Sequence, residues 1–417
     1  MGWPEKTPEL DYFYPTCDLV TGPDIIFFWV ARMIMAGYEF MGELPFRNVY
    51  FTSIIRDEKG RKLSKSLGNS PDPLDVIAEY GADALRFSVV YIAPVGMDIR
   101  YANEKCEIGR NFANKLWNAC RFRQMQGPSS AVEKLPENLS SDEKWMAAKL
   151  DAAVGFIDGE LEKYRFHTAA HALYDLVWSD FCDWFVEAEK LPMRAGGADK
   201  DRALAVLDWA LFRILKLLHP FMPFVTEELA HRMGLLKEGE FLMYQALPVC
   251  ENRPFDADAA QAEAKFELVK GGRFLRSSYN IPDGRKLKFH IKAADAAALK
   301  GLESELDSLK LLLNAESIDL SLESFDSAKL GAAPSKLCQA GVISLPLAGL
   351  IDVEAERAKL KKELADIEKW IAGTAGKLKN ERFVANAPEQ VVANARAQLA
   401  DLEGKKQRTE ELLASLG

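Results

Sequence analysis

Two lysines three positions apart are the residues of this sequence best suited to chemistry. Lys62 and Lys65 alternate with Ser64 and Ser66 in the stretch Gly60–Asn69, which has a glycine near each end. Alternating charges and hydroxyls suit neither an apolar helix face nor a buried strand, so the stretch predicts a mobile surface loop. Two ammonium groups on such a loop can bind phosphate and stabilise a leaving pyrophosphate. Taken alone, a plain solvated basic loop explains the stretch equally well.

The residues on both sides of this lysine loop narrow its interpretation. The loop, with Leu63 at its centre, resembles the K-M-S-K-S signature of class I aminoacyl-tRNA synthetases. Three downstream stretches continue as these enzymes do, namely Asn69, Pro71–Asp75 and Tyr80–Phe87. Upstream, Tyr14–Thr16 and Asp24–Met35 resemble the valyl-tRNA synthetase form of this segment. The resemblance runs along essentially the whole chain.

The resemblance implies an enzyme that activates valine with ATP to valyl-adenylate and then esterifies tRNA-Val. Its catalytic residues would be Lys62 and Lys65. The ATP-binding residues would be Lys62, Ser64, Lys65 and Ser66. Mg²⁺ would arrive with ATP, and we expect no tightly bound metal. Asp24 and Trp29 would line the amino-acid pocket, although Asp24 could equally cap a helix and Trp29 could equally pack in a core.

The chain resembles only the C-terminal half of such an enzyme. The family's His-x-Gly-His motif is absent from the sequence, and its editing domain would lie upstream of Gly2. We therefore expect half of the catalytic sheet to be missing and this fragment to be inactive by itself. Two alternatives stay open: an isolated tRNA-binding module without catalysis, and an isoleucyl-tRNA synthetase, against which the Asp24–Met35 stretch argues.

Composition sets wide limits on the class of protein. With 417 residues, 48% of them hydrophobic, the chain can form about three domains with buried cores. No apolar run approaches the roughly 20 residues of a membrane helix. The six cysteines form no C-x-x-C pair, which is typical of free thiols in a reducing compartment. We expect a cytoplasmic monomer without membrane contacts. The net charge of −9 still allows a local basic stripe to bind RNA.

The first hundred residues have an α/β pattern. The apolar runs Leu19–Val20 and Val49–Phe51 predict buried parallel strands. Between them, Pro23–Tyr38 predicts one helix, and its apolar residues on most sides predict burial. Residues 71 to about 100 predict helix followed by strand, with helix starts at Pro73 and Ala82 and a last apolar run at Phe87–Ile92.

Residues 103–254 have the 3.6-residue period of helices. Apolar positions repeat through three long stretches, which predict a bundle. The candidate tRNA-binding residues on the first helix are Asn111, Lys115 and Arg121, beside Trp117 and Phe122. Unstacked RNA bases bind to aromatic rings, guanidinium planes and amides. A solvated helix face explains each of these residues as well.

The last part of the sequence predicts a small unit and a long hairpin. Residues 255–349 mix helix and strand signals. After residue 350, apolar positions alternate four and three apart in two stretches separated by Asn380–Pro388, which predicts an antiparallel coiled-coil hairpin. By resemblance this hairpin is an arm that contacts tRNA, with Lys377 and Arg382 among its phosphate-binding residues.

The sequence thus predicts a multidomain protein, α/β in its first part and mostly α after it. The predicted parts are a partial Rossmann-type catalytic domain with signature loop and junction (1–102), a helical anticodon-binding bundle (103–254), a small α+β connector (255–349) and the coiled-coil arm (350–417).

Overall fold

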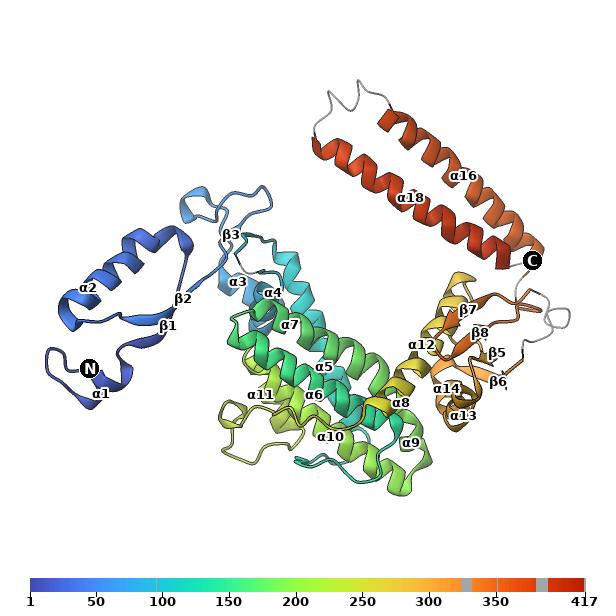
Figure 1. Cartoon of the computed structure of the whole chain (residues 1–417), viewed down its shortest axis with the longest axis horizontal. Helices are drawn as coiled ribbons and strands as arrows, with labels where there is room; N and C mark the ends of the chain where they lie inside the picture. Colours follow the sequence, from blue (N-terminus) through green and yellow to red (C-terminus); the bar gives the residue numbers. More distant parts are fainter. Residues whose placement is uncertain (95, 324–331, 351, 380–388, 416–417) are drawn as a thin grey trace. The chain divides into compact units, whose positions relative to one another are not determined.

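The computed structural model describes residues 1–417 except 95, 324–331, 351, 380–388 and 416–417. The chain forms two compact units, Met1–Asp256 and Ala257–Gly417. Both mix helices with sheet strands, which confirms the predicted α and β character (Figure 1). Among the described helices, none combines the length and the apolar character that crossing a bilayer requires.

The first segment is a small α/β element. After α1 (Pro8–Phe13), the parallel strands β1 (Thr16–Thr21) and β2 (Phe46–Phe51) pair from Thr16 opposite Phe46 to Thr21 opposite Phe51. The predicted strands and the helix between them are confirmed, but the predicted burial of the strands is wrong, because Val20 is 62% exposed and Phe51 is 37% exposed. That helix has three sections, η1 (Pro23–Ile25), the π-helical η2 (Ile26–Val30) and α2 (Ala31–Met41). It ends where Gly42 adopts a left-handed backbone with φ of 74°.

The predicted burial of this helix is wrong. Phe27, Phe28 and Trp29 are 83%, 62% and 56% exposed, and only Val30 of this run is buried. The less exposed positions follow one stripe of the helix. The sheet beside it has two described strands, so it offers packing surface to one stripe only. Apolar residues on the other sides are left at the surface.

The junction that follows carries the lysine loop. Its elements are β3 (Ile55–Arg56), η3 (Lys65–Leu67), α3 (Pro73–Tyr80), α4 (Ala82–Tyr91) and β4 (Ile99–Arg100). Strands β3 and β4 are parallel. The predicted helix starts are confirmed. The apolar run Phe87–Ile92, however, belongs mostly to α4 and not to a strand. A short apolar run fits a buried helix as well as a strand, and Phe87 is fully buried against Phe112, with ring centroids 4.8 Å apart.

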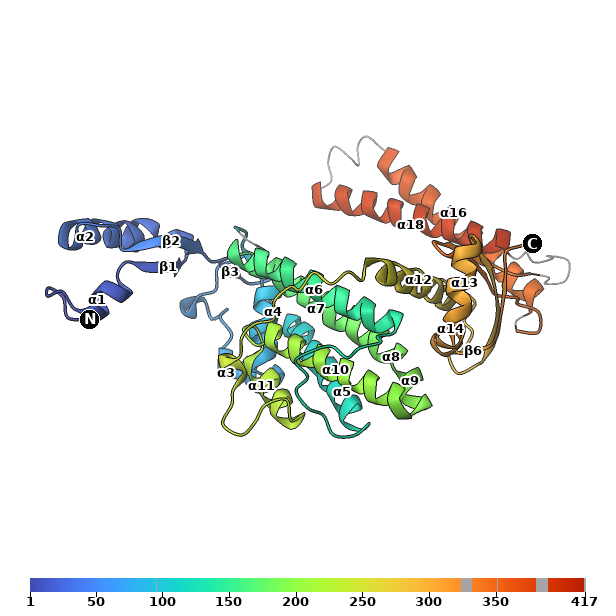
Figure 2. The same cartoon turned by 60° about the horizontal axis from the view of Figure 1, so that its bottom comes forward.

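The helical bundle follows the predicted apolar period. Its elements are η4 (Asn103–Lys105), α5 (Cys106–Gln124), α6 (Ser141–Glu162), α7 (Phe166–Asp175), the π-helical η5 (Leu176–Phe185), α8 (Val186–Ala188), α9 (Lys190–Ala195), α10 (Gly197–Leu218), α11 (Pro223–Arg232) and η6 (Leu242–Tyr244). Figures 1 and 2 show α5, α6 and α10 lying alongside one another. The positions predicted as core on these helices, such as Phe112, Phe181 and Trp209, are buried.

The second unit begins with an α+β part. Its elements are α12 (Asp256–Ser278), β5 (Leu287–Ala293), α13 (Ala296–Ser304), α14 (Leu306–Leu313), β6 (Ala315–Ser321), β7 (Ser335–Cys338) and β8 (Gly341–Ser344). The strand order is β6-β5-β8-β7. Arg273 and Arg276 of α12 donate to the carbonyls of Leu312 and Leu313 at the end of α14. These two cations therefore hold the unit together.

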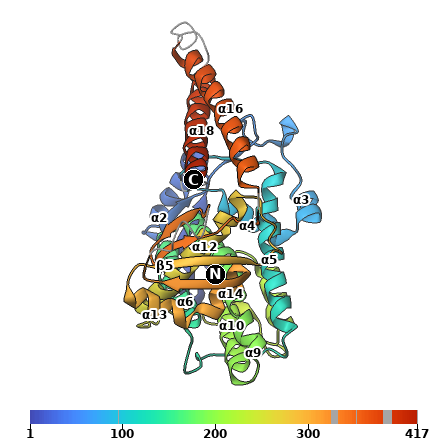
Figure 3. The same cartoon turned by 90° about the vertical axis from the view of Figure 1, so that its right-hand side faces the viewer.

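Two 27-residue helices, α16 (Val353–Lys379) and α18 (Glu389–Ser415), complete the second unit. Figures 1 and 3 show them side by side and running in opposite directions. Among their described side chains the buried ones are Leu360, Ile367, Thr374, Val392, Leu402 and Thr409, which stand seven or ten positions apart on each helix, as the predicted alternation of four and three requires. Glu368 and Lys406 form an ion pair of 2.8 Å between the two helices. Arg382 and the last contact position, Leu416, lie outside the described residues.

Candidate functional site

The lysine loop is a folded hairpin that leads into a short helical turn. After β3, the chain reverses at Asp57–Gly60, where the Gly60 N–H donates to the Asp57 carbonyl at 2.9 Å. The returning strand pairs Lys62 with Arg56, and the Leu63 N–H donates to the Ile55 carbonyl at 3.2 Å. The loop therefore has backbone pairing on the side of Lys62.

The hairpin places Lys62 beside Asp24. The Lys62 ammonium donates to the Asp24 carboxylate, from 38 positions along the chain, and this bond holds the pKa of Asp24 below its ordinary value. Asp24 follows the carboxyl end of β1 by three residues. Ligands of open α/β sheets bind outside the carboxyl ends of the strands. Two predicted site residues thus meet at the edge where such a ligand would bind.

The other predicted loop residues lie close by and face outward. Lys65 is exposed at the start of η3. The hydroxyls of Ser64 and Ser66 are hydrogen bonded to each other at 2.7 Å. Trp29, predicted for the amino-acid pocket, is 56% exposed in η2. The loop therefore offers one exposed ammonium, one ammonium paired to a carboxylate, and two hydroxyls.

Sequence reasoning gave no role to two polar residues that close the loop. The Asn69 side chain accepts from the Ser64 N–H at 2.9 Å, and donates to the Lys62 carbonyl at 3.2 Å and to Asp57 at 3.0 Å. Asp57 also accepts from the backbone and side chain of Arg61. The bonds from Asn69 and Arg61 lower the pKa of Asp57 to about 2. The position of Asn69, three residues after the end of the signature, was the signal that could have identified it.

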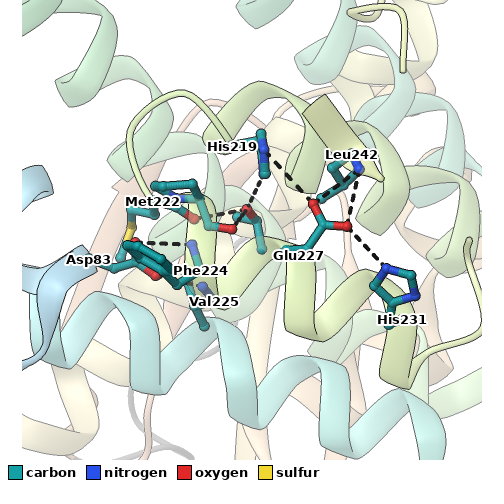
Figure 4. A network of polar contacts seen from close by, with 10 residues as sticks. Asp83, His219, Met222, Phe224, Val225, Glu227, His231 and Leu242 are labelled. Carbon is teal, nitrogen blue, oxygen red and sulfur yellow. Dashed lines mark hydrogen bonds and ion pairs between the residues drawn. The ribbon is translucent and has the colours of Figure 1, made fainter. Parts of the chain in front are cut away.

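A second polar network joins the junction to the bundle (Figure 4). Asp83 of α4 is buried and accepts from the backbone N–H groups of Phe224 at 3.2 Å and Val225 at 2.6 Å, at the start of α11. A carboxylate at a helix N-terminus is stabilised by the unpaired N–H groups there. One turn further along α4, Arg86 donates to the Pro220 carbonyl at 3.1 Å. Through Arg86 and Asp83, helix α4 is therefore hydrogen bonded to the turn between α10 and α11 and to the start of α11. The sequence did not reveal this role.

A histidine lies inside the same network (Figure 4). Thr226 donates its hydroxyl proton to the Met222 carbonyl at 2.8 Å, so it accepts a bond of 2.8 Å from Nδ1 of His219. Nε2 of His219 is 3.9 Å from Glu227, which also accepts from the Leu242 N–H. Burial lowers the pKa of His219 from 6.5, so the imidazole is neutral near pH 7.

The bundle separates the three predicted tRNA-binding residues of α5. Asn111 and Arg121 are exposed. Lys115 is half-buried, because its ammonium is paired with Asp183 and lies 4.2 Å from the ring centroid of Trp178. The ammonium of Lys115 is thus engaged within the protein.

Aromatic rings that the sequence did not single out together lie close to Lys115. Trp178 stacks on Tyr174 with ring centroids 5.3 Å apart and an interplanar angle of 11°. Phe122 lies two turns along α5 from Lys115. The Lys190 ammonium lies over the Phe122 ring, 5.4 Å from its centroid, and pairs with Glu187 at 2.5 Å. Both rings have one face under a lysine that a carboxylate neutralises. Such rings can stack with unpaired bases when the lysines move.

The two remaining predicted tRNA-binding residues are Lys377 and Arg382. Lys377 is exposed near the end of α16, while Arg382 lies outside the described residues. In the described ranges, no group of three or more His, Cys, Asp or Glu side chains is placed to hold a metal ion.

Three family models match successive parts of the chain. The model for tRNA synthetases class I (I, L, M and V) matches residues 1–102. The anticodon-binding domain of tRNA ligase matches residues 143–291, and the valyl tRNA synthetase tRNA binding arm matches residues 352–417. Together with the lysine loop at the carboxyl edge of a parallel sheet, these matches place the chain in the class I aminoacyl-tRNA synthetases.

Curated relatives identify the family within this class. The valine–tRNA ligase of Parabacteroides distasonis is 41% identical over 411 residues, which are 98% of this chain and 45% of the relative. That of Chlorobaculum tepidum is 40% identical over 419 residues, 96% of this chain and 46% of the relative. The chain belongs to the valine–tRNA ligase family. It spans about half the length of the curated relatives it matches.

Among solved structures, the ternary complex of the Agrobacterium radiobacter K84 LeuRS with tRNA and LeuAMS matches with a TM-score of 0.47. It is 22% identical, and the match covers 58% of this chain and 30% of that chain.

Proposed function

We propose that this chain is the C-terminal half of a valine–tRNA ligase, which joins valine to tRNA-Val through valyl-adenylate. The observation that supports this best is the lysine loop, whose Lys62 meets Asp24 at the carboxyl edge of β1 and β2. An ammonium pair at that edge suits a nucleoside triphosphate, because charge builds on the leaving pyrophosphate. In this proposal, residues 1–102, which include β1 and β2, form part of a Rossmann-type catalytic domain.

In this proposal each loop residue has a distinct role. Lys65, which is exposed, binds the triphosphate first, and Lys62 joins it after leaving Asp24. Ser64 and Ser66 add hydrogen bonds to the phosphate oxygens. Mg²⁺ comes with ATP as part of the substrate and needs no cage of protein ligands.

The valine end of the site is proposed at the start of the neighbouring helix. Trp29 forms one wall of the amino-acid pocket, and its exposed ring has a face available for this. Asp24 carries the charge that faces the substrate. A rigid aromatic wall selects a small branched side chain by shape, with a discrimination of about 1–3 kcal/mol per methylene.

The tRNA is proposed to contact the bundle and the arm. Asn111 and Arg121 of α5 are exposed, and the rings of Trp178 and Phe122, each beside a lysine, are the proposed stacking faces. We propose that α16 and α18 form a coiled coil, with Lys377 on its phosphate-binding side and Arg382 beyond the described part. The complete protein acts as a cytoplasmic monomer with tRNA-Val, ATP and L-valine as its partners.

A second candidate is a tRNA-binding module without catalysis. Two observations favour it for this chain: Lys62 is occupied by Asp24, and the described sheet beside the loop has two strands. An isoleucine-specific enzyme is the third reading, and the valine–tRNA ligase names of the curated relatives argue against it.

The proposal is tested by binding of the chain to tRNA-Val and tRNA-Ile transcripts at low and moderate salt. Phosphate contacts alone weaken steeply with salt and do not distinguish the two RNAs. We expect a preference for tRNA-Val of about tenfold or more that survives moderate salt. Arg121→Gln should weaken this binding, whereas Arg194→Gln, an exposed arginine on α9, should not.

Equal and salt-labile binding to both transcripts would contradict the valine assignment of the bundle and arm. Selective binding without formation of an adenylate from valine and ATP would favour the second candidate for this chain.

A further inference from the structure

One side-chain amide closes the lysine loop. All three hydrogen-bonding groups of the Asn69 amide are used: Oδ1 accepts from the Ser64 N–H at 2.9 Å, and Nδ2 donates to the Lys62 carbonyl at 3.2 Å and to Asp57 at 3.0 Å. Lys62 and Ser64 lie on either side of Leu63. The amide therefore bridges the backbone between the two lysines.

The other end of this bridge is anchored at the turn before the loop. Asp57 accepts from the Arg61 N–H and from Arg61 Nε, both at 2.8 Å, and its carboxylate is 15% exposed. Its own N–H donates to the Arg61 carbonyl at 2.8 Å. Asp57 is thus fixed by the hairpin, and through Asn69 it fixes the stretch that carries the lysines.

We propose that Asn69, anchored by Asp57, is a positioning residue that holds the backbone of Lys62 and Ser64 in a fixed geometry before a triphosphate binds. Preorganised charges stabilise a developing anion best, because no reorganisation is needed at the moment of reaction. The identity of the ligand rests on the proposed function. The brace, by which we mean the hydrogen bonds of Asn69 and Asp57 to the loop, rests on the geometry alone. Asn69 and Asp57 do not touch the phosphates.

Only an asparagine satisfies this geometry. An aspartate at position 69 would lose both donors and would bring a second negative charge against Asp57. An alanine would leave the Ser64 N–H and the Lys62 carbonyl without this partner.

The first test measures the brace directly by amide hydrogen exchange of the 417-residue chain. We expect Asn69→Ala to speed exchange at the Ser64 N–H by about tenfold, the effect of losing a typical hydrogen bond. Asn114→Ala, the same change at an exposed position of α5, should have no effect. An unchanged rate in Asn69→Ala would overturn the brace.

The second test uses inorganic tripolyphosphate as the probe. Asn69→Ala changes no charge, so a positioning role predicts weaker binding, by about three- to tenfold, with the same dependence of affinity on salt. A merely electrostatic effect would change the salt dependence as well. Equal affinity of Asn69→Ala and the unchanged chain would contradict the positioning role.

The two tests separate this inference from the proposed function. If the unchanged chain shows no tripolyphosphate binding, the phosphate role of the loop in this chain is wrong. The exchange of the Ser64 amide then decides the brace alone, and the tRNA preference of the bundle stays as a separate measurement.

Discussion

Lys62 carries one positive charge for which two anions compete. In the structure the Asp24 carboxylate holds it, and in the proposed function a triphosphate takes it. Both side chains are about half exposed, and such an ion pair is screened by water and easily exchanged. A polyphosphate carries more charge than a carboxylate. The pair is therefore suited to hold the lysine near the sheet edge without preventing its transfer to the ligand.

The first prediction concerns this pair. Asp24→Asn should raise the rate at which an amine-specific reagent acylates Lys62, by about twofold or more, because the paired ammonium is shielded by the carboxylate. Lys65, which is exposed already, should react at an unchanged rate. Mass spectrometry of the labelled chain gives both rates. Asp199→Asn, which breaks an exposed pair with Arg202 far along the sequence, is the control. Equal labelling of Lys62 in both variants would contradict the pair.

At the scale of elements, the structure depends on how α4 holds the α10–α11 turn. Asp83 satisfies the first N–H groups of α11, and Arg86 donates to the carbonyls of Pro220 and Phe221 in the turn after α10. His219 lies within the turn and is kept neutral by burial, even though Glu227 and Asp83 oppose the decrease of its pKa. The turn is thus held by Asp83 and Arg86 of α4 and by an uncharged histidine inside.

The second prediction follows from that histidine. A lowered pKa means that the folded protein binds the proton less readily than the unfolded chain. The stability contributed by neutral His219 is therefore present above about pH 6.5 and is lost as the pH falls below it. The melting temperature should fall between pH 7.5 and pH 5.5, and it should fall less in His219→Asn, which keeps a donor for Thr226. His231→Asn, at an exposed histidine beside the same Glu227, should leave the decrease unchanged.

The third prediction concerns the α16–α18 arm. Gly376 lies on the exposed side of α16, and an added Cβ would meet no atom within 4 Å. Replacing a helix-interior glycine by alanine stabilises a helix by about 1 kcal/mol. Gly376→Ala should therefore raise the melting temperature of the arm, measured by far-ultraviolet circular dichroism. Gly284→Ala, in a turn with equally open space, should not shift that transition. A shift of the same size in both variants would contradict this explanation.

At the scale of the whole molecule, the first fifty residues differ from the rest in how little apolar surface they bury. Phe27, Phe28 and Met35 are 83%, 62% and 70% exposed on one short helical segment. Contiguous apolar surface of this kind marks an interaction site or an aggregation hazard. The bundle, by contrast, buries many of its large residues, such as Phe112, Phe181 and Trp209.

The fourth prediction tests this contrast. Phe28→Ser should lower the binding of an apolar dye such as ANS and slow aggregation, with little change in melting temperature, because the ring is 62% exposed. Phe156→Ser, at an isolated ring of α6 that is 50% exposed, should reduce dye binding much less. A large loss of stability in Phe28→Ser would show that the ring packs inside the protein.

Much of the fold could be predicted because periodicity is local. The apolar spacing predicted α5 and α10 with their buried faces, and the alternation of four and three predicted the contact positions of α16 and α18. Burial of Phe27–Trp29 could not be predicted, since it depends on how many strands cover the helix. Phe87–Ile92 was ambiguous because a short apolar run fits both helix and strand. The four domain boundaries stay a prediction.

In the candidate site, too, local patterns could be predicted, whereas contacts between distant parts of the chain could not. The lysines and Asp24 were identified by motif, and their meeting at the sheet edge depends on the return of the hairpin. No role was predicted for Asp83 or Asn69, although both lie in stretches that carry the resemblance, because most of their partners are backbone groups, which leave no pattern in a sequence. Lys115 was predicted to face RNA from its charge alone, and its partners Trp178 and Asp183 lie more than 60 positions further along the chain.

The interface between α16 and α18 includes buried Thr374 and Thr409, and glycines lie at positions 373, 376 and 404 of these helices. Glycines weaken a helix, and the buried threonines place hydroxyls between the two helices, so both choices make this part less stable than an all-aliphatic hairpin. During purification or storage, a trace of protease will cut here before it cuts the bundle. We expect the first degradation product on a gel to be a shorter chain that lacks the α16–α18 arm.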